Sequence, residues 1–459
     1  MDARGDRQTQ LDLVDAYTRL GNIQGNAYDQ NLGDPAGALV NLGKALAIAG
    51  PLSASDSKDR EAIRALALVQ QSRSEILWQT GKTPEAVPVM REALKSFDAL
   101  AADPHATAAL IYEVSSAYGT LGDELGQSGT ASLADSTGAV AAYRQSLALD
   151  DRALRVDPNF LRAKRGLAIN RMKIGSVEME TNPAEALKEF QAALQSADAL
   201  PRSEQDSLPI VRLRAMLLRK LANALERLGA YAQAVPLFEQ ALEIIQRIAA
   251  QDPKDSRALF DVVTVLDDQA KSYEDAADPV LAATPGDRRA NLVLAEKNLA
   301  QAAAGLERLL KQDPANDIWK ASLASIQVRI GVIRGNLHIP GGSDELSKKA
   351  LAALKEVAEK DQASPMVLDQ AANAFLTVEP VSLRDPQFAV PCAEREVAMS
   401  RATTPSRLLT LAHAYRASGQ VEKGHAAAKE GLALLPALQP GSAKPTIRKQ
   451  LENEAQSRF

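Results

Sequence analysis

The sequence predicts an all-α fold, a solenoid of about nine helix pairs followed by one further helix at the C-terminus. A chain of 459 residues is longer than one compact core usually requires, so either several domains or an elongated array is expected. Aromatic residues make up only 4%, Ala and Leu are frequent, and strand-like runs of Val, Ile and Thr are scarce. In addition, a stripe of small residues recurs along the chain, which is typical of a repeat architecture.

The stripe is clearest close to the C-terminus. Gly424, Ala428 and Gly431 follow one another at steps of four and three residues, so they share one face of a helix. A face without bulk lets a second helix approach closely, and the apolar residues of 408–415 supply that second helix. Gly419 lies between the two segments, where the first helix must end and the chain must turn. Two antiparallel helices are therefore predicted.

The same step of four and three residues recurs six more times. The sets are Ala38, Leu42 and Ala45; Ala86, Met90 and Ala93; Ala139, Tyr143 and Ser146; Ala186, Phe190 and Ala193; Ala234, Phe238 and Ala241; and Ala295, Leu299 and Ala302. The sequence also repeats itself at an offset of 101 residues. Seven residue types recur at this distance: Tyr17, Leu20, Gly21, Gly25, Asp34, Gly37 and Ala38 are found again as Tyr118, Leu121, Gly122, Gly126, Asp135, Gly138 and Ala139. The first helices are expected to begin near residues 10, 57, 105, 159, 206, 255, 315, 365 and 405, and the first, seventh and eighth pairs are the least regular.

These positions resemble the tetratricopeptide repeat, a helix-turn-helix of 34 residues. The resemblance implies a right-handed superhelix whose first helices line a concave face, and that this face binds a peptide or helix of another protein. One feature departs from the family. Asp-Pro pairs at 157–158, 252–253 and 313–314 stand further from the small-residue stripe than Pro436 does, which predicts second helices about two turns longer.

The domain organisation follows from the same pattern. Residues 1–436 are expected to form one repeat solenoid, and residues 437–459 a turn and a polar helix that caps its exposed apolar end. Loops at 24–34, 126–135, 276–288 and 335–343 exceed a tight turn and carry Gly, Pro, Asn or Asp.

Composition and motifs argue against several function classes. A net charge of -5 provides no basic surface for nucleic acid, and one cysteine excludes an internal disulfide. No leader and no uninterrupted apolar span were found, so a soluble chain without membrane insertion is expected. No nucleotide-binding, kinase or protease motif occurs, and no cofactor or metal is expected. Gly81, Lys82 and Thr83 lack the glycine that a phosphate loop needs, which favours a repeat turn.

Isolated residues of catalytic type favour structural roles. Cys392 is expected to be a small buried helix residue, and Trp78 and Trp319 are expected to lie in the core. His413 falls on a first helix, where a surface or groove contact is a simpler role than metal binding.

The candidate binding residues lie on two consecutive first helices in the middle of the chain. A concave face there would present Arg219, Asn223, Glu226, Arg227, Asp267, Lys271, Glu274 and Asp275. Mixed charge in a concavity suits a polar, extended ligand. A solvated face without a specific partner explains the same charges.

Two more specialised alternatives concern the same helices. Chaperone-adaptor members of the family clamp a C-terminal carboxylate with basic and asparagine residues. Arg219 and Asn223 match the first element of that pattern and Arg329 matches part of the third, but Asp268 stands where a second asparagine should be and would repel a carboxylate. An enzyme or metal-binding protein that uses inner-face acids such as Asp267 and Asp275 is the alternative from another class, although their spacing is not specific.

A second resemblance concerns whole stretches of sequence. Residues 19–39, 383–400 and 411–436 are similar to the repeat-bearing C-terminal half of certain bacterial serine/threonine protein kinases. The kinase catalytic half has no counterpart, so the resemblance implies a kinase-associated sensor or regulatory region without phosphoryl transfer. The expected function is a non-catalytic scaffold for a protein or peptide segment. A cytoplasmic location is expected, or an extracytoplasmic one if the chain belongs to a membrane-anchored receptor kinase, and the oligomeric state is left open.

Overall fold

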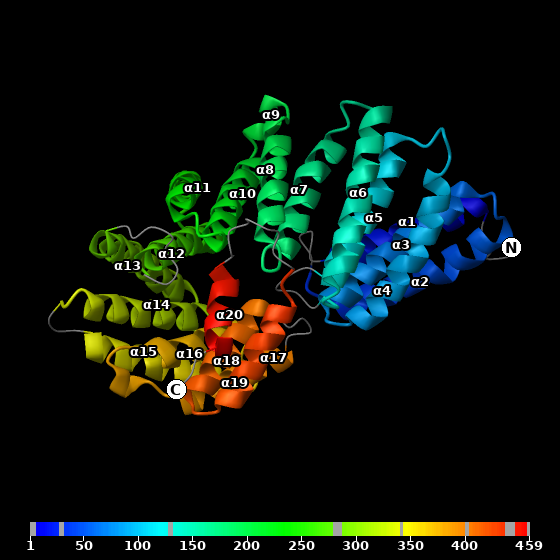
Figure 1. The fold of residues 1–459 in the computed structure, drawn as a ribbon. Coiled ribbons are helices and arrows are strands. Elements are labelled where there is room, and N and C mark those ends of the chain that lie inside the picture. The colour runs from blue at the N-terminus through cyan, green and yellow to red at the C-terminus, as the bar shows by residue number, and fades with distance from the viewer. Residues whose placement is uncertain are drawn as a thin grey trace. The chain divides into compact units, whose positions relative to one another are not determined.

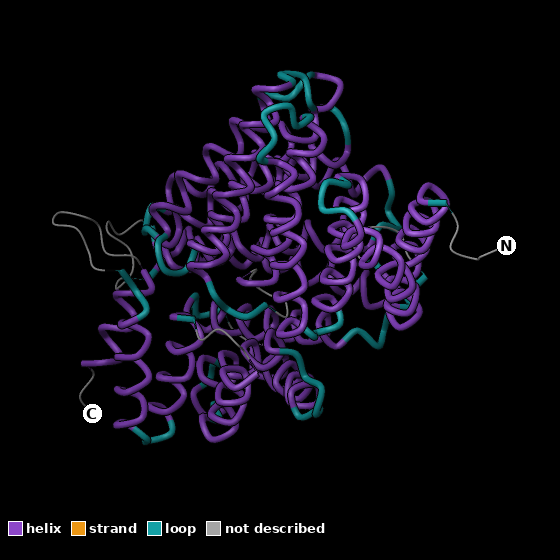
Figure 2. Tube along the Cα trace, turned by 90° about the vertical axis from the view of Figure 1, so that its right-hand side faces the viewer, coloured by secondary structure: helices purple, strands orange, loops and turns teal. Residues whose placement is uncertain are grey.

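The computed structural model is helical wherever it has regular structure. It describes residues 6–26, 32–126, 132–278, 287–339, 343–399, 404–436 and 446–456. Within these ranges no β-strand occurs, and the chain alternates between helices and loops (Figure 2). This confirms the predicted all-α class. The predicted loops at 24–34, 126–135, 276–288 and 335–343 fall partly outside the described residues.

The chain divides into two compact units, which are described separately. The first comprises Met1–Val177 with Gln195–Leu200, and the second Glu178–Leu194 with Pro201–Phe459. The first unit contains α1 (Arg7–Gly25), α2 (Pro35–Ser55), α3 (Arg60–Gln79), α4 (Thr83–Ala101), α5 (Ala108–Gly126), α6 (Ser136–Val156) and nearly all of α7 (Leu161–Glu178) (Figure 1). Helices α1 and α2, α3 and α4, and α5 and α6 pack as hairpins, and each hairpin contacts the next.

The second unit repeats this arrangement over more hairpins. It contains most of α8 (Pro183–Asp198), α9 (Arg202–Gln205), α10 (Leu208–Arg227), α11 (Tyr231–Gln251), α12 (Ser256–Ala277), α13 (Arg288–Gln312), α14 (Asp317–Asn336), α15 (Ser343–Ala358), α16 (Pro365–Thr377), the 3-10 helix η1 (Val381–Leu383), α17 (Pro386–Met399), α18 (Pro405–Ala417), α19 (Val421–Ala433) and α20 (Thr446–Gln456). Hairpins run from α10–α11 to α18–α19, again with contacts between neighbours. Both units are therefore solenoids of helix pairs. The handedness of the superhelix and the single solenoid over residues 1–436 stay predictions.

The helix boundaries agree closely with the sequence pattern. The first helices start at residues 7, 60, 108, 161, 208, 256, 317, 365 and 405, each within three residues of the prediction. The three predicted long second helices also exist. Helices α6, α11 and α13 end directly before Asp157, Asp252 and Asp313, where the following proline cannot continue a helix. By contrast, α19 has only 13 residues.

Glycines make the tight turns between paired helices. Gly81, Gly229 and Gly419 have φ angles of +80°, +77° and +84°, in the left-handed region that favours glycine. Each lies two residues beyond the last residue of a first helix, where the helix ends and the chain reverses. Gly81 therefore belongs to a repeat turn between α3 and α4, as predicted, and not to a phosphate loop.

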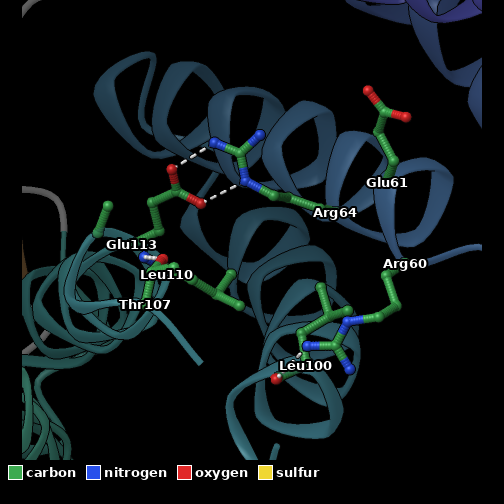
Figure 3. A pocket seen from close by; sticks show the side chains of 8 residues that line it. Arg60, Glu61, Arg64, Leu100, Thr107, Leu110 and Glu113 are labelled. Atoms are coloured by element: carbon green, nitrogen blue, oxygen red, sulfur yellow. Dashed lines mark hydrogen bonds and ion pairs between the residues drawn. The ribbon is translucent and has the colours of Figure 1, made fainter. Parts of the chain in front are cut away.

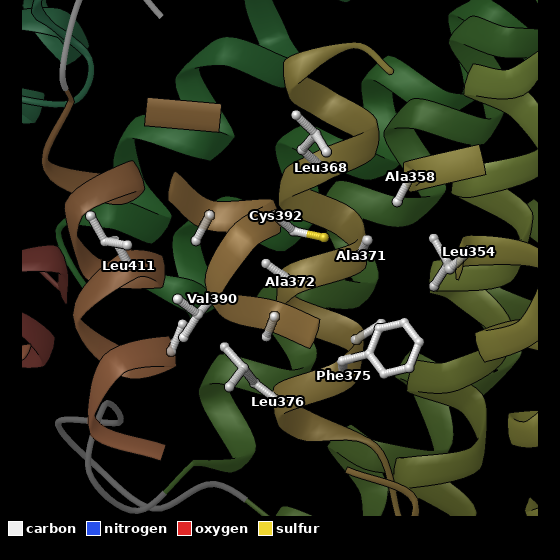
Figure 4. Close-up of a cluster of buried hydrophobic side chains, with 14 of the residues drawn as sticks. Leu354, Ala358, Leu368, Ala371, Ala372, Phe375, Leu376, Val390, Cys392 and Leu411 are labelled. Atoms are coloured by element: carbon white, nitrogen blue, oxygen red, sulfur yellow. The ribbon is translucent and has the colours of Figure 1, made fainter. Parts of the chain in front are cut away.

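The recurrent stripe of small residues is the packed seam of each hairpin. Its alanines, among them Ala38, Ala86, Ala139 and Ala234, are fully buried. Figure 4 shows a core cluster of the second unit, where Ala371 and Ala372 of α16 lie among Leu368, Phe375 and Cys392. Cys392 is 3% exposed, and burial raises the pKa of its thiol to about 11. This confirms the prediction of a small buried helix residue. Trp78 is likewise buried in the first unit, and Trp319 packs against Phe260 in the second.

Two glycines on α5 offer a direct test of the seam. A Cβ atom at Gly122 would overlap the ring of the fully buried Tyr143 on α6, whereas a Cβ atom at Gly119 would meet Asn170 at 3.5 Å, an ordinary contact. We therefore expect Gly122→Ala to destabilise the first unit by about 1–3 kcal/mol. Gly119→Ala is expected to be neutral or stabilising by up to about 1 kcal/mol, because alanine favours the helix. Urea unfolding of both variants checks this, and equal effects would contradict it.

One helix of the first unit is long and apolar enough to cross a membrane, judged by length and composition among the described residues. This helix is α2. In the structure it pairs with α1 and also contacts α3. Its Ala38, Leu42, Ala45 and Ala49 are fully buried in that contact.

The first helices of the second unit follow one another in a row. Helix α14 contacts α16, α16 contacts α18, and α10 contacts α12. Helix α12 is joined to α14 by the ion pairs of Arg329. The row formed by α10, α12, α14, α16 and α18 is called the inner face below. Over α14, α16 and α18 the first helices approach one another more closely than the second helices do, so this part of the unit curves toward the inner face.

Candidate partner-binding face

The structure brings the eight predicted binding residues together on the inner face. Four of them, Arg219, Asn223, Glu226 and Arg227, lie on α10. The other four, Asp267, Lys271, Glu274 and Asp275, lie on α12, the next first helix. Most are partly buried, and Asp275 is almost completely so. Seven of these side chains are held by partners within the unit, which the sequence did not indicate: Arg219, Asn223, Glu226, Asp267, Lys271, Glu274 and Asp275.

The first set of contacts joins α10 to α12 through Asp268. Arg219 Nη1 donates to Asp268 Oδ2 at 2.8 Å, and Asn223 Nδ2 donates to the same oxygen at 3.0 Å. The Arg219 and Asp268 side chains are 25% and 26% exposed, so the pair is partly shielded from water. One carboxylate oxygen thus accepts hydrogen bonds from both the arginine and the asparagine that would begin a carboxylate clamp. That specialised prediction gains no support from the geometry.

The second set joins α12 to α14 through Arg329. Its Nη2 donates to Glu274 Oε1 at 2.6 Å, its Nε donates to the same oxygen at 3.1 Å, and its Nη1 pairs with Asp267. Burial would lower the pKa of Arg329, but the two carboxylates outweigh burial and raise it. Arg329 therefore stays charged and connects two acids of α12 with α14. The sequence suggested Arg329 only as part of a ligand clamp and missed this role.

The third set surrounds Glu226. Ser272 Oγ donates to Glu226 Oε2 at 3.0 Å, and Lys271 pairs with Asp275 one turn away on α12. Burial raises the pKa of Glu226 to about 7, although Lys271 acts in the opposite direction. Glu226 therefore binds a proton more readily than an exposed glutamate does.

Similar polar contacts continue along the row. Gln370 Nε2 of α16 donates to Ser322 Oγ of α14 at 3.2 Å, and Thr410 Oγ1 of α18 donates to Asp369 Oδ1 of α16 at 3.4 Å. Each joins a first helix to the next one. We call these contacts between first helices the polar rungs. They fix the side chains of the inner face in place, and the charges largely cancel between partners.

Four carboxylates of α12 pair with three different cations. Asp267 and Glu274 share Arg329, Asp268 pairs with Arg219, and Asp275 pairs with Lys271. Over the described ranges, no group of three or more His, Cys, Asp or Glu residues is arranged to hold a metal ion. Among the described residues, the acids of α12 thus act as partners of basic side chains.

Helix α20 lies at the same face, at the end of the second unit's row. It packs on α18 and α19 and also contacts α10 (Figure 1). Its capping role stays a prediction. Thr446 Oγ1 donates to the backbone oxygen of Glu226 at 3.3 Å and lies 3.5 Å from Tyr231 Oη. At its other end, Glu454 accepts from Arg416 Nε at 2.6 Å and from Nη2 at 3.0 Å. The C-terminal helix therefore reaches the predicted binding residue Glu226, which the sequence did not anticipate.

His413 faces this helix from α18. Burial lowers the pKa of its imidazole, and the Glu454 carboxylate of α20 opposes that effect. His413 is thus partly buried beside α20, which agrees with the predicted contact role.

Two small cavities lie in the first unit, away from the predicted residues. One has a volume of about 290 Å³ and is lined by residues of α3, α4 and α5 (Figure 3). Its cations are engaged, since Arg64 pairs with Glu113 and Arg60 donates to the Leu100 carbonyl at 3.0 Å. The other, of about 470 Å³, lies beside His105 and Phe160. Neither combines convergent polar groups with an enclosed apolar wall, as ligand sites usually do.

Comparison with known proteins gives a match over the centre of the chain. Residues 213–289 match the family model of the tetratricopeptide repeat. No curated protein matches the sequence.

Solved structures with a similar course of the chain have low sequence identity. Apo RapI has 11% identity and a TM-score of 0.47 and covers 93% of this chain and 97% of its own. A Rap protein complexed with competence and sporulation factor has 10% identity and a TM-score of 0.43, with coverages of 98% and 100%. A tetratricopeptide repeat protein from Parabacteroides merdae has 14% identity and a TM-score of 0.36, with coverages of 75% and 98%.

The matched segment contains most of α10, the whole of α11 and α12, and the start of α13. All eight predicted binding residues and Asp268 fall within it. The two first helices that carry the predicted binding residues, α10 and α12, therefore lie in the segment that matches the tetratricopeptide repeat model.

Proposed function

We propose that this chain is a non-catalytic scaffold that binds a protein or peptide segment on the inner face of its second unit. The observation that carries the proposal is the row of first helices joined by polar rungs. Side chains held in place by partners lose little freedom when a ligand binds, so the face is preorganised for recognition. Its partly buried amides, hydroxyls and paired charges suit a polar segment that offers both donors and acceptors.

Site-specific cross-linking in the native cell tests this proposal. A photoreactive amino acid at Asn223 or Arg227 is expected to capture one protein through one short segment, mapped by mass spectrometry. Glu239 and Arg247, exposed on the second helix α11, are matched control positions. Capture from the control positions as strong as from α10, or no capture from α10, would contradict the assignment.

The finer part of the proposal concerns a protein kinase. The resemblance of residues 19–39, 383–400 and 411–436 to kinase-associated repeat regions supports a sensor or regulatory role beside such an enzyme. A kinase or its substrate among the cross-linked proteins would favour that role. A cytoplasmic location remains part of this proposal.

Within the ranges that the structure describes, no arrangement of side chains favours the alternative of an enzyme or metal-binding protein. The acids Asp267 and Glu274 that it would use both pair with Arg329. Titration of the chain with Mg²⁺ in a calorimeter distinguishes the two ideas. A saturable heat of Mg²⁺ binding that is lost in Asp267→Asn would favour the alternative. For a scaffold, no saturable heat of Mg²⁺ binding is expected.

A further inference from the structure

Helix α20 has the pattern of a helix that binds by one face. Ile447, Leu451 and Ala455 follow one another at steps of four residues, and most of the remaining side chains are charged or polar. Ile447 is 6% exposed and Leu451 is fully buried, so the two large apolar side chains both lie in the contact. Residues 437–445, which connect α20 to α19, lie outside the described residues.

The receiving surface is shaped for these side chains. Gly431 of α19 faces Leu451, and a Cβ atom there would lie 2.9 Å from Leu451 Cδ2, so glycine leaves the space that the leucine occupies. Arg416 of α18 meets Glu454 with two hydrogen bonds. The surface thus offers a recess for the Leu451 side chain and a cation, Arg416, for the carboxylate of Glu454. Glu454 lies two helical turns after Ile447.

The contact extends further than a cap requires. A terminal cap has to cover the last hairpin, here α18 and α19. The first residue of α20 additionally meets the C-terminal turn of α10 through Thr446 and Glu226. The positive N-terminal end of one helix dipole thereby meets the negative C-terminal end of another. Helix α20 therefore occupies the part of the inner face where Glu226 lies.

We propose that the surface formed by α10, α18 and α19 is a binding site for an amphipathic helix of another protein, and that α20 is the internal occupant which this helix displaces. The partner helix carries large apolar residues four positions apart and an acidic residue three positions after the second, as Ile447, Leu451 and Glu454 do in α20. This inference rests on the proposed scaffold function and names the class of its partner.

The test uses the full chain and a fluorescein-labelled synthetic peptide of residues 443–459 as the probe. In wild type, α20 competes with the peptide. Leu451→Asp places a charge in the recess beside Gly431 and is expected to release α20, so that amide exchange over 446–456 accelerates and the peptide binds about ten-fold or more tightly than to wild type. Leu434→Asp, at an exposed leucine of the same region, is the matched control and is expected to behave as wild type.

A charge exchange tests the specificity of the site. Adding Arg416→Glu to Leu451→Asp is expected to weaken binding of the peptide about ten-fold, and a peptide carrying Glu454→Arg is expected to recover it. Glu454→Arg in the full chain provides a milder release of α20 if Leu451→Asp does not fold, as judged by circular dichroism.

Several results would overturn the inference. The first is that the peptide binds wild type and Leu451→Asp with equal affinity. The second is that the peptide does not bind a variant whose α20 amide hydrogens exchange rapidly. The third is that this variant forms a dimer in which each copy receives α20 from the other. Cross-linking from Asn223 to a partner, together with failure of the peptide to bind, would leave the scaffold function in place and refute only the helical partner.

Discussion

Replacing Lys173 with methionine is expected to destabilise the first unit by about 3 kcal/mol, because it removes a cation that pairs with a buried carboxylate. Lys173 Nζ donates to Asp123 Oδ2 at 2.7 Å, and the Asp123 side chain is only 3% exposed. Tyr143 Oη donates to the other carboxylate oxygen at 2.7 Å. Urea unfolding followed by Trp78 fluorescence, in a Trp319→Phe background, measures the change in the first unit.

An exposed pair in the same unit supplies the control. Lys95 and Glu92 are 71% and 57% exposed, so Lys95→Met is expected to change stability by less than about 0.5 kcal/mol. Adding Asp123→Asn to Lys173→Met is expected to recover most of the loss, since the buried negative charge is then removed together with its cation. A cost for Lys173→Met as small as that for Lys95→Met would contradict the assigned role.

Stability of the first unit is expected to fall as the pH rises from about 4 to about 8. Glu124 is fully buried on α5, where it accepts from Ser74 Oγ at 2.5 Å, and burial raises its pKa to about 8, with Glu75 and Asp123 adding to the effect. Burial also raises the pKa of Asp150 to about 7. The folded chain therefore keeps protons that the unfolded chain releases above about pH 4. Each such proton gives a slope of about 1.4 kcal/mol per pH unit.

Glu124→Gln isolates this effect. Glutamine keeps a polar side chain opposite Ser74 but cannot ionise, so the variant is expected to be more stable than wild type at pH 8 and close to it at pH 4.5, with a smaller slope between them. Glu92→Gln, at an exposed position of α4, is expected to leave the slope unchanged. Thermal unfolding across this pH range measures both. A variant less stable than wild type at pH 8 would show that the buried group is held ionised.

Local sequence signals predicted the helices well because each signal acts within a few residues. The offset of 101 residues is a good example. Gly21 faces Leu42 as Gly122 faces Tyr143, and these two neighbours are themselves 101 residues apart. Asp34 and Asp135 both cap the helix that follows them. The small residues of the stripe and the turn glycines could therefore be predicted from the sequence, whereas the capping role of the two aspartates is seen in the structure.

The candidate face could be predicted only in part. The pattern identified Arg219, Asn223 and Asp267 as inner-face residues, since helical spacing decides which face a side chain takes. It could not show that Asp268 and Arg329 would hold them, because those contacts span 45 to 62 residues and depend on how consecutive hairpins are rotated. The contact of Thr446 with Glu226 depends on the curvature of several hairpins, for which no local signal exists.

The contact between α20 and α10 also bears on how the second unit folds. In an open array of repeats each hairpin depends only on its neighbours, so end hairpins can unravel one by one. Thr446 and Glu226 are 220 positions apart in the sequence, and their contact joins the last helix to an early hairpin of the unit. Helix α20 can contact α10 only after the intervening hairpins have formed. Unfolding of the hairpin that contains α10 or of the last hairpin breaks this contact. The second unit is therefore expected to unfold more cooperatively than an open row of the same repeats, with its slowest folding step at the closure of this ring.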